Sequence, residues 1–176
     1  MSRPPSTGLV VPVDAARELV APWLRLLPAA GRSLPPHVTA LWPFLPVDVL
    51  DAAVERRLEE LLAGAASFPF GLTRVATLAD ASVLVPEPAE PFAALTRLLW
   101  DEWPECPPYG GAFDDIAPHV VVALDPSAAD RTAIEAGLAP QLPLAARAAE
   151  VLLVEETPSG ALHERRRFAL GAGPGA

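Results

Sequence analysis

The 176 residues suit a single domain, their apolar fraction of 51% supports a buried core, and the one cysteine, Cys106, excludes an internal disulfide and a metal cage built from cysteines. The formal net charge of −9 and the absence of a basic stripe argue against binding of long nucleic acid, but they are compatible with a small phosphate ester in a local pocket. No uncharged apolar stretch approaches the ~18 residues that a membrane span needs, and no secretory leader is recognisable, so we expect a cytoplasmic protein with no membrane partner.

The N-terminal part of the chain predicts a strand, a helix and a second strand. Apolar and β-branched residues predict a strand over residues 7–13. Apolar residues at helical spacing then predict a helix over 15–27, with Asp14 as its N-cap and a kink at Pro22. A pair of prolines favours an extended chain and predicts a strand over 37–44.

The middle of the chain continues this alternation. A helix is predicted over 49–63, opened by Pro46 and Asp48 and ended by Gly64. Two strands around a turn and a third helix follow, over residues 68–78, 82–85 and 91–103.

The C-terminal part begins with a loop at 105–115, which contains several prolines and glycines and is too irregular for a helix or a strand. A strand, a fourth helix, one or two further strands and a last strand are predicted over residues 119–124, 125–138, 142–155 and 161–170. We expect one domain over residues 1–170 and a flexible C-terminal tail over 171–176.

One short pattern occurs twice. Pro36-His37-Val38-Thr39 and Pro118-His119-Val120-Val121 each open a predicted strand with a Pro-His pair, and the two histidines are 82 positions apart. Residues two apart in a strand point to the same face, so His37 shares a face with Thr39, and His119 shares one with Val121. The repeat is consistent with a duplicated βα unit.

Two imidazoles on neighbouring strands could act on one anionic centre. The ordinary pKa of histidine, about 6.5, lets the ring exchange a proton near neutral pH. One ring would take a proton from an attacking water while the other protonates the leaving oxygen, and the Thr39 hydroxyl would hold a phosphate oxygen. This chemistry requires no metal and no cofactor.

The segment 35–44 resembles the first H-x-T motif of the 2H phosphoesterase superfamily, the 2′-5′ RNA ligase-like cyclic phosphodiesterases, and the segment 117–123 resembles the second. The resemblance implies an α+β, bilobal, LigT-like fold, in which two pseudo-twofold-related βα lobes place antiparallel sheets along a central cleft. It implies metal-independent hydrolysis, or reverse ligation, of a 2′,3′-cyclic phosphate or 2′-5′ linkage in a small nucleotide or RNA end.

The resemblance also assigns roles and exposes one departure. His37 and His119 are implied to be the acid and the base, respectively, and Thr39 the hydroxyl that binds phosphate. Where the second motif should have Thr or Ser, this chain has Val121, which has a similar shape but no donor. Loss of a hydrogen bond made only in the transition state would slow the reaction about 10- to 100-fold. The alternative function is therefore a weakened or inactive protein that binds a nucleotide or another anion in the same cleft.

Four more residues are candidate substrate contacts. Trp42 and Tyr109 could stack on a base, although Trp42 also fits an apolar core. Arg165 and Arg167 could bind phosphate, although a run of arginines is usually a solvated surface. We expect a monomer. A third reading is an interaction module in which the histidines are only structural.

Overall fold

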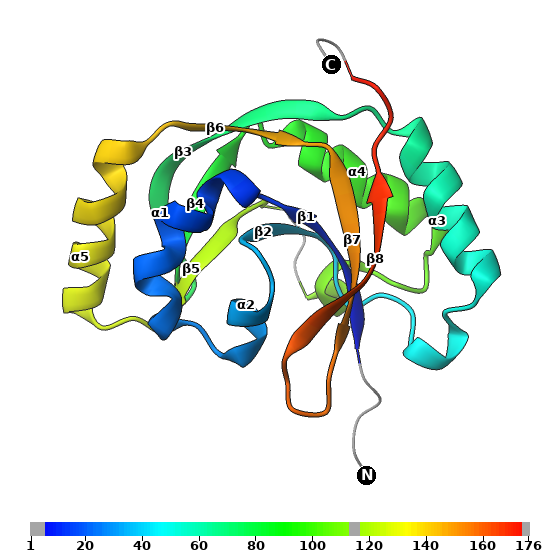
Figure 1. Cartoon of the computed structure of the whole chain (residues 1–176), viewed down its shortest axis with the longest axis horizontal. Coiled ribbons are helices and arrows are strands. Elements are labelled where there is room, and N and C mark those ends of the chain that lie inside the picture. The colour runs from blue at the N-terminus through cyan, green and yellow to red at the C-terminus, as the bar shows by residue number, and fades with distance from the viewer. Residues whose placement is uncertain (1–5, 113–116, 174–176) are drawn as a thin grey trace.

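A computed structural model describes residues 6–112 and 117–173 of the chain. Its centre is one eight-stranded sheet in the order β6-β3-β4-β5-β2-β1-β7-β8, and every pair of neighbouring strands is antiparallel. The sheet is strongly curled, with α1 and α5 on one side of the molecule and α3 on the other (Figure 1). The strands are β1 (Thr7–Pro12), β2 (His37–Leu41), β3 (Phe68–Leu78), β4 (Ala81–Glu87), β5 (Val120–Leu124), β6 (Leu144–Ala148), β7 (Glu150–Glu156) and β8 (Leu162–Ala169).

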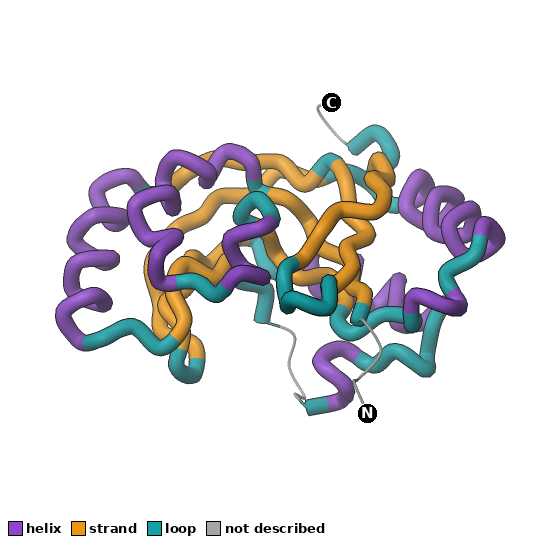
Figure 2. Tube along the Cα trace, turned by 60° about the horizontal axis from the view of Figure 1, so that its bottom comes forward, coloured by secondary structure: helices purple, strands orange, loops and turns teal. Residues whose placement is uncertain are grey.

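Helical segments lie at both ends of the molecule, and others lie beside the strands that cross between these ends (Figure 2). The α-helices are α1 (Arg17–Val20), α2 (Ala29–Ser33), α3 (Ala52–Gly64), α4 (Glu90–Glu102) and α5 (Ala128–Leu138). Short 3-10 segments are η1 (Asp14–Ala16), η2 (Ala21–Leu26), η3 (Val47–Val49), η4 (Pro108–Gly111) and η5 (Ala139–Gln141).

The sheet has two similar halves that meet between β2 and β5. At this junction Val38 lies opposite Val120. In each half, two neighbouring antiparallel strands are joined by a helical connection: β1 and β2 through the segment that contains η2, and β4 and β5 through α4. The connections cross over, because η2 packs on β5 and α4 packs on β2. The predicted antiparallel α+β architecture is therefore confirmed, with the strands of both halves joined in one continuous sheet.

The predicted helix over 15–27 is helical but divided into η1, α1 and η2. The predicted capping by Asp14 is wrong, because its side chain accepts a hydrogen bond from Nε of Arg17 at 2.7 Å and makes no cap bond to the backbone. Pro22 lies in the first turn of η2, where its missing N–H costs little, so it accompanies a new segment rather than a kink inside one helix.

Two other local features differ from the sequence prediction. Helix α3 begins after Asp51, whose carboxylate accepts hydrogen bonds from the backbone N–H groups of Ala53 and Val54, each at 2.9 Å. Pro46 and Asp48 were predicted to open this helix. Instead, Pro46 directly precedes the separate turn η3, and Asp48 lies within that turn. Helix α2 was not predicted, because its residues, Ala-Ala-Gly-Arg-Ser, lack an apolar periodicity.

The core consists of two clusters. The larger one joins the sheet to the long helices, with fully buried residues such as Leu58 and Leu62 of α3 and Leu99 of α4. The smaller cluster contains Val10, Leu34, Leu152 and Val154, and Trp42 and Leu162 pack against it. Because Val10 is the cross-strand partner of Thr39, the smaller cluster lies on the face of the sheet that bears Thr39.

The first residues of the predicted tail are bound to the start of β3. The backbone N–H of Ser67 donates to the carbonyl of Gly171 at 2.9 Å, and the N–H of Gly173 donates to the Ser67 hydroxyl at 3.2 Å. Residues 174–176 lie outside the described part of the chain. Within residues 6–112 and 117–173, none of the helices has the length and apolar character needed to cross a membrane.

Gly8 in β1 is predicted to be irreplaceable. A Cβ atom at this position would lie 1.9 Å from Cε3 of Trp42, because the indole packs directly on the backbone of β1. Gly8→Ala should therefore lower the free energy of unfolding by about 1–3 kcal/mol, as measured by chemical denaturation. Gly71→Ala in β3 is the matched control, since its Cβ would meet nothing closer than 3.8 Å. Equal stability of the two variants would contradict the packing described here.

Candidate active site

The centre of the sheet brings the two Pro-His motifs together. His37 is the first residue of β2, and His119 directly precedes β5. With Val38 opposite Val120 in an antiparallel pair, His37 lies opposite Val121 and Thr39 lies opposite His119. All four of these side chains are half-buried, whereas both central valines are buried on the opposite face. The four side chains of His37, Thr39, His119 and Val121 thus form one cluster, the histidine cluster, on one face of the sheet.

Both imidazole rings are held in the same way. Nδ1 of His37 donates a hydrogen bond to the carbonyl of Pro35 at 2.8 Å, and Nδ1 of His119 donates to the carbonyl of Ala117 at 2.8 Å. A carbonyl can only accept, so in each ring Nδ1 bears the hydrogen and Nε2 is the nitrogen that can exchange a proton. In both motifs a proline stands between the histidine and the accepting carbonyl, and its fixed φ restricts the intervening backbone. The same anchor thus accompanies the Pro-His pair in both motifs.

The two rings influence each other electrostatically. Burial, which disfavours the charged ring, lowers the pKa of His37 below its ordinary value of 6.5. The hydrogen bond to Pro35 opposes this shift, and repulsion by the charge of His119 lowers the pKa of His37 further. The rings are thus close enough to repel each other when both are protonated. An anion placed between them would relieve that repulsion.

Tyr109 connects the Pro/Gly loop to the site. Its backbone N–H donates to the carbonyl of Trp42 at 2.6 Å, and its hydroxyl shares a side-chain hydrogen bond with Thr39. Burial raises the pKa of Tyr109, and the bond with Thr39 acts in the opposite direction. Tyr109 therefore lies beside the candidate phosphate-binding hydroxyl. The ring of Trp42 packs on Gly8 and against the smaller core cluster.

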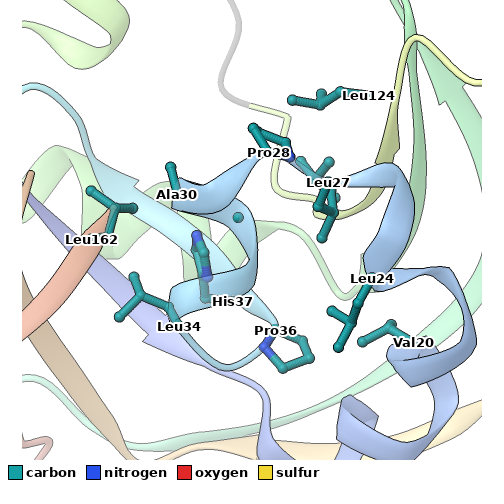
Figure 3. Close-up of a pocket in the computed structure, with 12 residues that line it drawn as sticks. Val20, Leu24, Leu27, Pro28, Ala30, Leu34, Pro36, His37, Leu124 and Leu162 are labelled. Atoms are coloured by element: carbon teal, nitrogen blue, oxygen red, sulfur yellow. The ribbon is translucent and has the colours of Figure 1, made fainter. Parts of the chain in front are cut away.

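An apolar pocket opens beside His37. Its volume is ≈190 Å³. Figure 3 shows the imidazole of His37 among Ala30, Leu34, Pro36 and Leu162, with further leucines of the helical connection nearby. The walls come from α1, η2, α2, β2, β5, β8 and the segments that connect η2, α2 and β2: Val20, Leu24, Leu27, Pro28, Ala30, Gly31, Leu34, Pro36, His37, Val121, Leu124 and Leu162. Sequence analysis did not predict the part of this wall that α2 supplies, Ala30 and Gly31, because α2 itself was not predicted.

The two candidate arginines lie on β8, an edge strand three positions from β2. The cross-strand pairs Thr39–Val10, Val10–Leu152 and Leu152–Arg167 place Arg167 in the same row and on the same face as Thr39. Arg167 therefore lies three strands away from Thr39 across the curled sheet, and its role as a phosphate ligand stays a prediction.

Both arginines already hold carboxylates. Arg165 pairs with Glu155 at 2.6 Å, and Arg167 makes a two-pronged contact with Glu164, with nitrogen–oxygen distances of 2.9 and 2.8 Å. A phosphate would have to compete with these partners. Arg166 points to the opposite face. There its guanidinium carbon lies 5.1 Å from the centroid of the Phe168 ring, and its nitrogens pair with Glu55 and Glu59 of α3.

The remaining chemistry-bearing side chains lie apart from the cluster. Burial, with a smaller effect of Glu105, raises the pKa of the Cys106 thiol to about 11, so the nucleophilic thiolate is scarce at neutral pH. His163 is exposed on β8, where its Nε2 lies 3.7 Å from Glu155. Among residues 6–112 and 117–173, no three His, Cys, Asp or Glu side chains are grouped in a way that could hold a metal ion.

The electrostatic contact between the rings can be tested by NMR titration of the histidine ring protons. His37 should titrate below pH 6.5, and His119→Gln should raise its midpoint because the like charge is removed. The midpoint should stay below 6.5, since burial is the larger cause. His163→Gln is the control and should leave His37 unchanged. A His37 midpoint that is insensitive to His119→Gln would show that the rings do not face a common space.

Comparisons with known proteins identify the family and the fold of this chain. The sequence matches the family model of the 2′-5′ RNA ligase superfamily over residues 5–159. A comparison with curated proteins returned no match. The similar solved structures include E. coli LigT complexed with 3′-AMP, which is 18% identical with a TM-score of 0.59, over 96% of this chain and 99% of LigT.

Two further structures give the same result. E. coli LigT complexed with NADP+ is 19% identical with a TM-score of 0.60, over 97% of this chain and 99% of that one. The protein TT0787 of Thermus thermophilus is 18% identical with a TM-score of 0.61, over 95% and 98%. These likenesses confirm the predicted LigT-like 2H phosphoesterase fold. Since the family match spans most of the sequence, the chain belongs to the 2′-5′ RNA ligase superfamily.

Proposed function

We propose that this protein is a phosphodiesterase that uses His37 and His119 as an acid/base pair on a 2′,3′-cyclic phosphate or a 2′-5′ linkage of a small nucleotide or RNA end. The observation that supports this most directly is the matched anchoring of the two rings. Each Nδ1 is occupied by a backbone carbonyl, so each Nε2 is available for proton transfer. The family match supports a phosphoesterase or ligase type of activity.

The environments of the rings support a division of labour. His37 adjoins the apolar pocket, which is a poor place for an attacking water and a better one for a substituent of the substrate. His37 is therefore proposed as the acid that protonates the leaving oxygen, and His119 as the base that takes a proton from water. Because burial lowers the pKa of His37 in the free protein, its protonated form depends on the bound anion, which stabilises that form and so allows the ring to donate a proton.

Hydroxyl groups would surround the bound phosphate on only one of its two sides. Thr39 lies opposite His119 and contacts Tyr109, so these two residues are proposed to hold phosphate oxygens on that side. Val121 lies opposite His37 and offers no donor there. This asymmetry favours a second candidate function, a protein that binds a nucleotide or another anion in the cluster but turns it over slowly or not at all.

The catalytic proposal is tested with a nucleoside 2′,3′-cyclic phosphate in the presence of a chelator. The protein should open the ring, and His37→Ala or His119→Ala should each lower the rate at least about 100-fold, because each removes one proton transfer. His163→Ala, at an exposed histidine of β8, should keep the full rate. Turnover that survives both cluster substitutions would reject the proposal, and binding without turnover would favour the second candidate.

The same variants separate the two roles. An aryl phosphodiester with a weakly basic leaving oxygen needs little help from an acid. On such a substrate, His37→Ala should retain a much larger share of the rate than His119→Ala. The reverse order would exchange the assignments.

Restoring the missing hydroxyl gives a further prediction. Val121→Thr should raise kcat about 10- to 100-fold, with little change in KM, if the new hydrogen bond forms only in the transition state. Val75→Thr, at another half-buried strand valine outside the cluster, serves as the control. Identical kinetics of Val121→Thr and the parent protein would show that a hydroxyl at this position does not meet the reacting phosphate.

A further inference from the structure

We propose that the pocket beside His37 binds an apolar group, about the size of one ring, that is attached to the phosphate of the substrate. This inference rests on the proposed function, because it narrows the substrate of the same site. It predicts that the substrate presents an aromatic ring or a short alkyl group to the pocket on the His37 side, while any sugar of the nucleotide or RNA end stays outside the pocket.

The chemistry of the walls supports an apolar occupant. His37 is the only one of the twelve lining residues whose side chain can donate or accept a hydrogen bond. The remaining lining residues are aliphatic, proline or glycine. A sugar or a charged group placed there would lose its hydrogen bonds to water without side-chain partners other than the imidazole, which is unfavourable. An apolar group would gain from leaving water.

The position of the pocket ties it to the phosphate. His37 and Val121 lie opposite each other across the β2–β5 pair, and both line the pocket. Cross-strand neighbours have Cβ atoms about 5 Å apart, so an occupant of the pocket lies directly beside the reacting group. Val121, which stands where the second motif would have a hydroxyl, therefore supplies part of the apolar wall of the pocket. Val121 is thus proposed to be part of a binding surface for the apolar group.

The pocket is held open by a hydrogen-bonded connection between two of its walls. The Ser33 hydroxyl at the end of α2 donates to the carbonyl of Ala30 at 2.9 Å. The same oxygen accepts a hydrogen bond from the backbone N–H of Leu162 in β8 at 2.9 Å. Ala30 and Leu162 both line the pocket, so its walls are fixed before a ligand arrives.

The volume of the pocket limits the size of the group that it can bind. A buried apolar cavity of about 150 Å³ is known to accommodate benzene. The pocket at ≈190 Å³ is therefore large enough for one six-membered ring and too small for a fused aromatic system with a sugar. Phenyl phosphate and methyl phosphate are suitable probes, since they differ only in the apolar group.

The test measures dissociation constants of inorganic phosphate, methyl phosphate and phenyl phosphate from the shifts of the His37 ring protons. Phenyl phosphate should bind at least about tenfold more tightly than methyl phosphate. Ala30→Leu, which fills the pocket, should abolish this preference and leave inorganic phosphate unaffected. Ala29→Leu is the matched control, because Ala29 is exposed on the same helix and does not line the pocket.

The outcomes of this test distinguish a failure of the pocket inference from a failure of the proposed phosphodiesterase function. If inorganic phosphate shifts His37 but phenyl phosphate binds no better than methyl phosphate, only the inference on the pocket is overturned. A preference for phenyl phosphate that survives Ala30→Leu places the ring elsewhere and overturns it as well. If none of the three anions shifts His37, both the proposed function and this inference fail.

Discussion

The candidate site depends on one contact, the antiparallel pairing of β2 with β5 at Val38 and Val120. Side chains alternate along a strand, so burial of these two valines on one face sends both Pro-His histidines to the other. A slip of one residue would turn a histidine toward the core, where an imidazolium is costly. Packing of two apolar side chains thus determines where two proton-transfer groups meet.

The pairing creates an asymmetric pair of imidazoles from a nearly symmetric pattern. Both rings have the same carbonyl anchor, but His37 adjoins an apolar pocket and has a lowered pKa. The side of His119 has the Thr39 and Tyr109 hydroxyls. One side of the cluster is therefore suited to hydrogen-bonding groups and the other to apolar ones. Two copies of one motif can take different roles because their surroundings differ.

Sequence patterns predicted much of this arrangement, and the gaps have identifiable causes. The repeated Pro-His pair and strand alternation indicated that His37 shares a face with Thr39 and that His119 shares one with Val121. Which residue opposes which was not predictable, because register is a property of two strands distant in sequence. The pocket was not predicted because α2 has no apolar periodicity and because the other walls come from segments distant in sequence. Arg165 and Arg167 were plausible phosphate ligands by residue type, but a linear sequence does not reveal that Glu155 and Glu150 of β7 pair with them.

The crossed helical connections have a consequence for the origin of the fold. Because η2 packs on β5 and α4 packs on β2, each half covers the central strand of the other. A lone half would expose both an apolar strand face and an unpaired strand edge, and such surfaces favour association with a second copy. Two copies of one half, paired as a symmetric dimer, would cover these surfaces, and each copy would contribute one histidine to a shared site on the twofold axis.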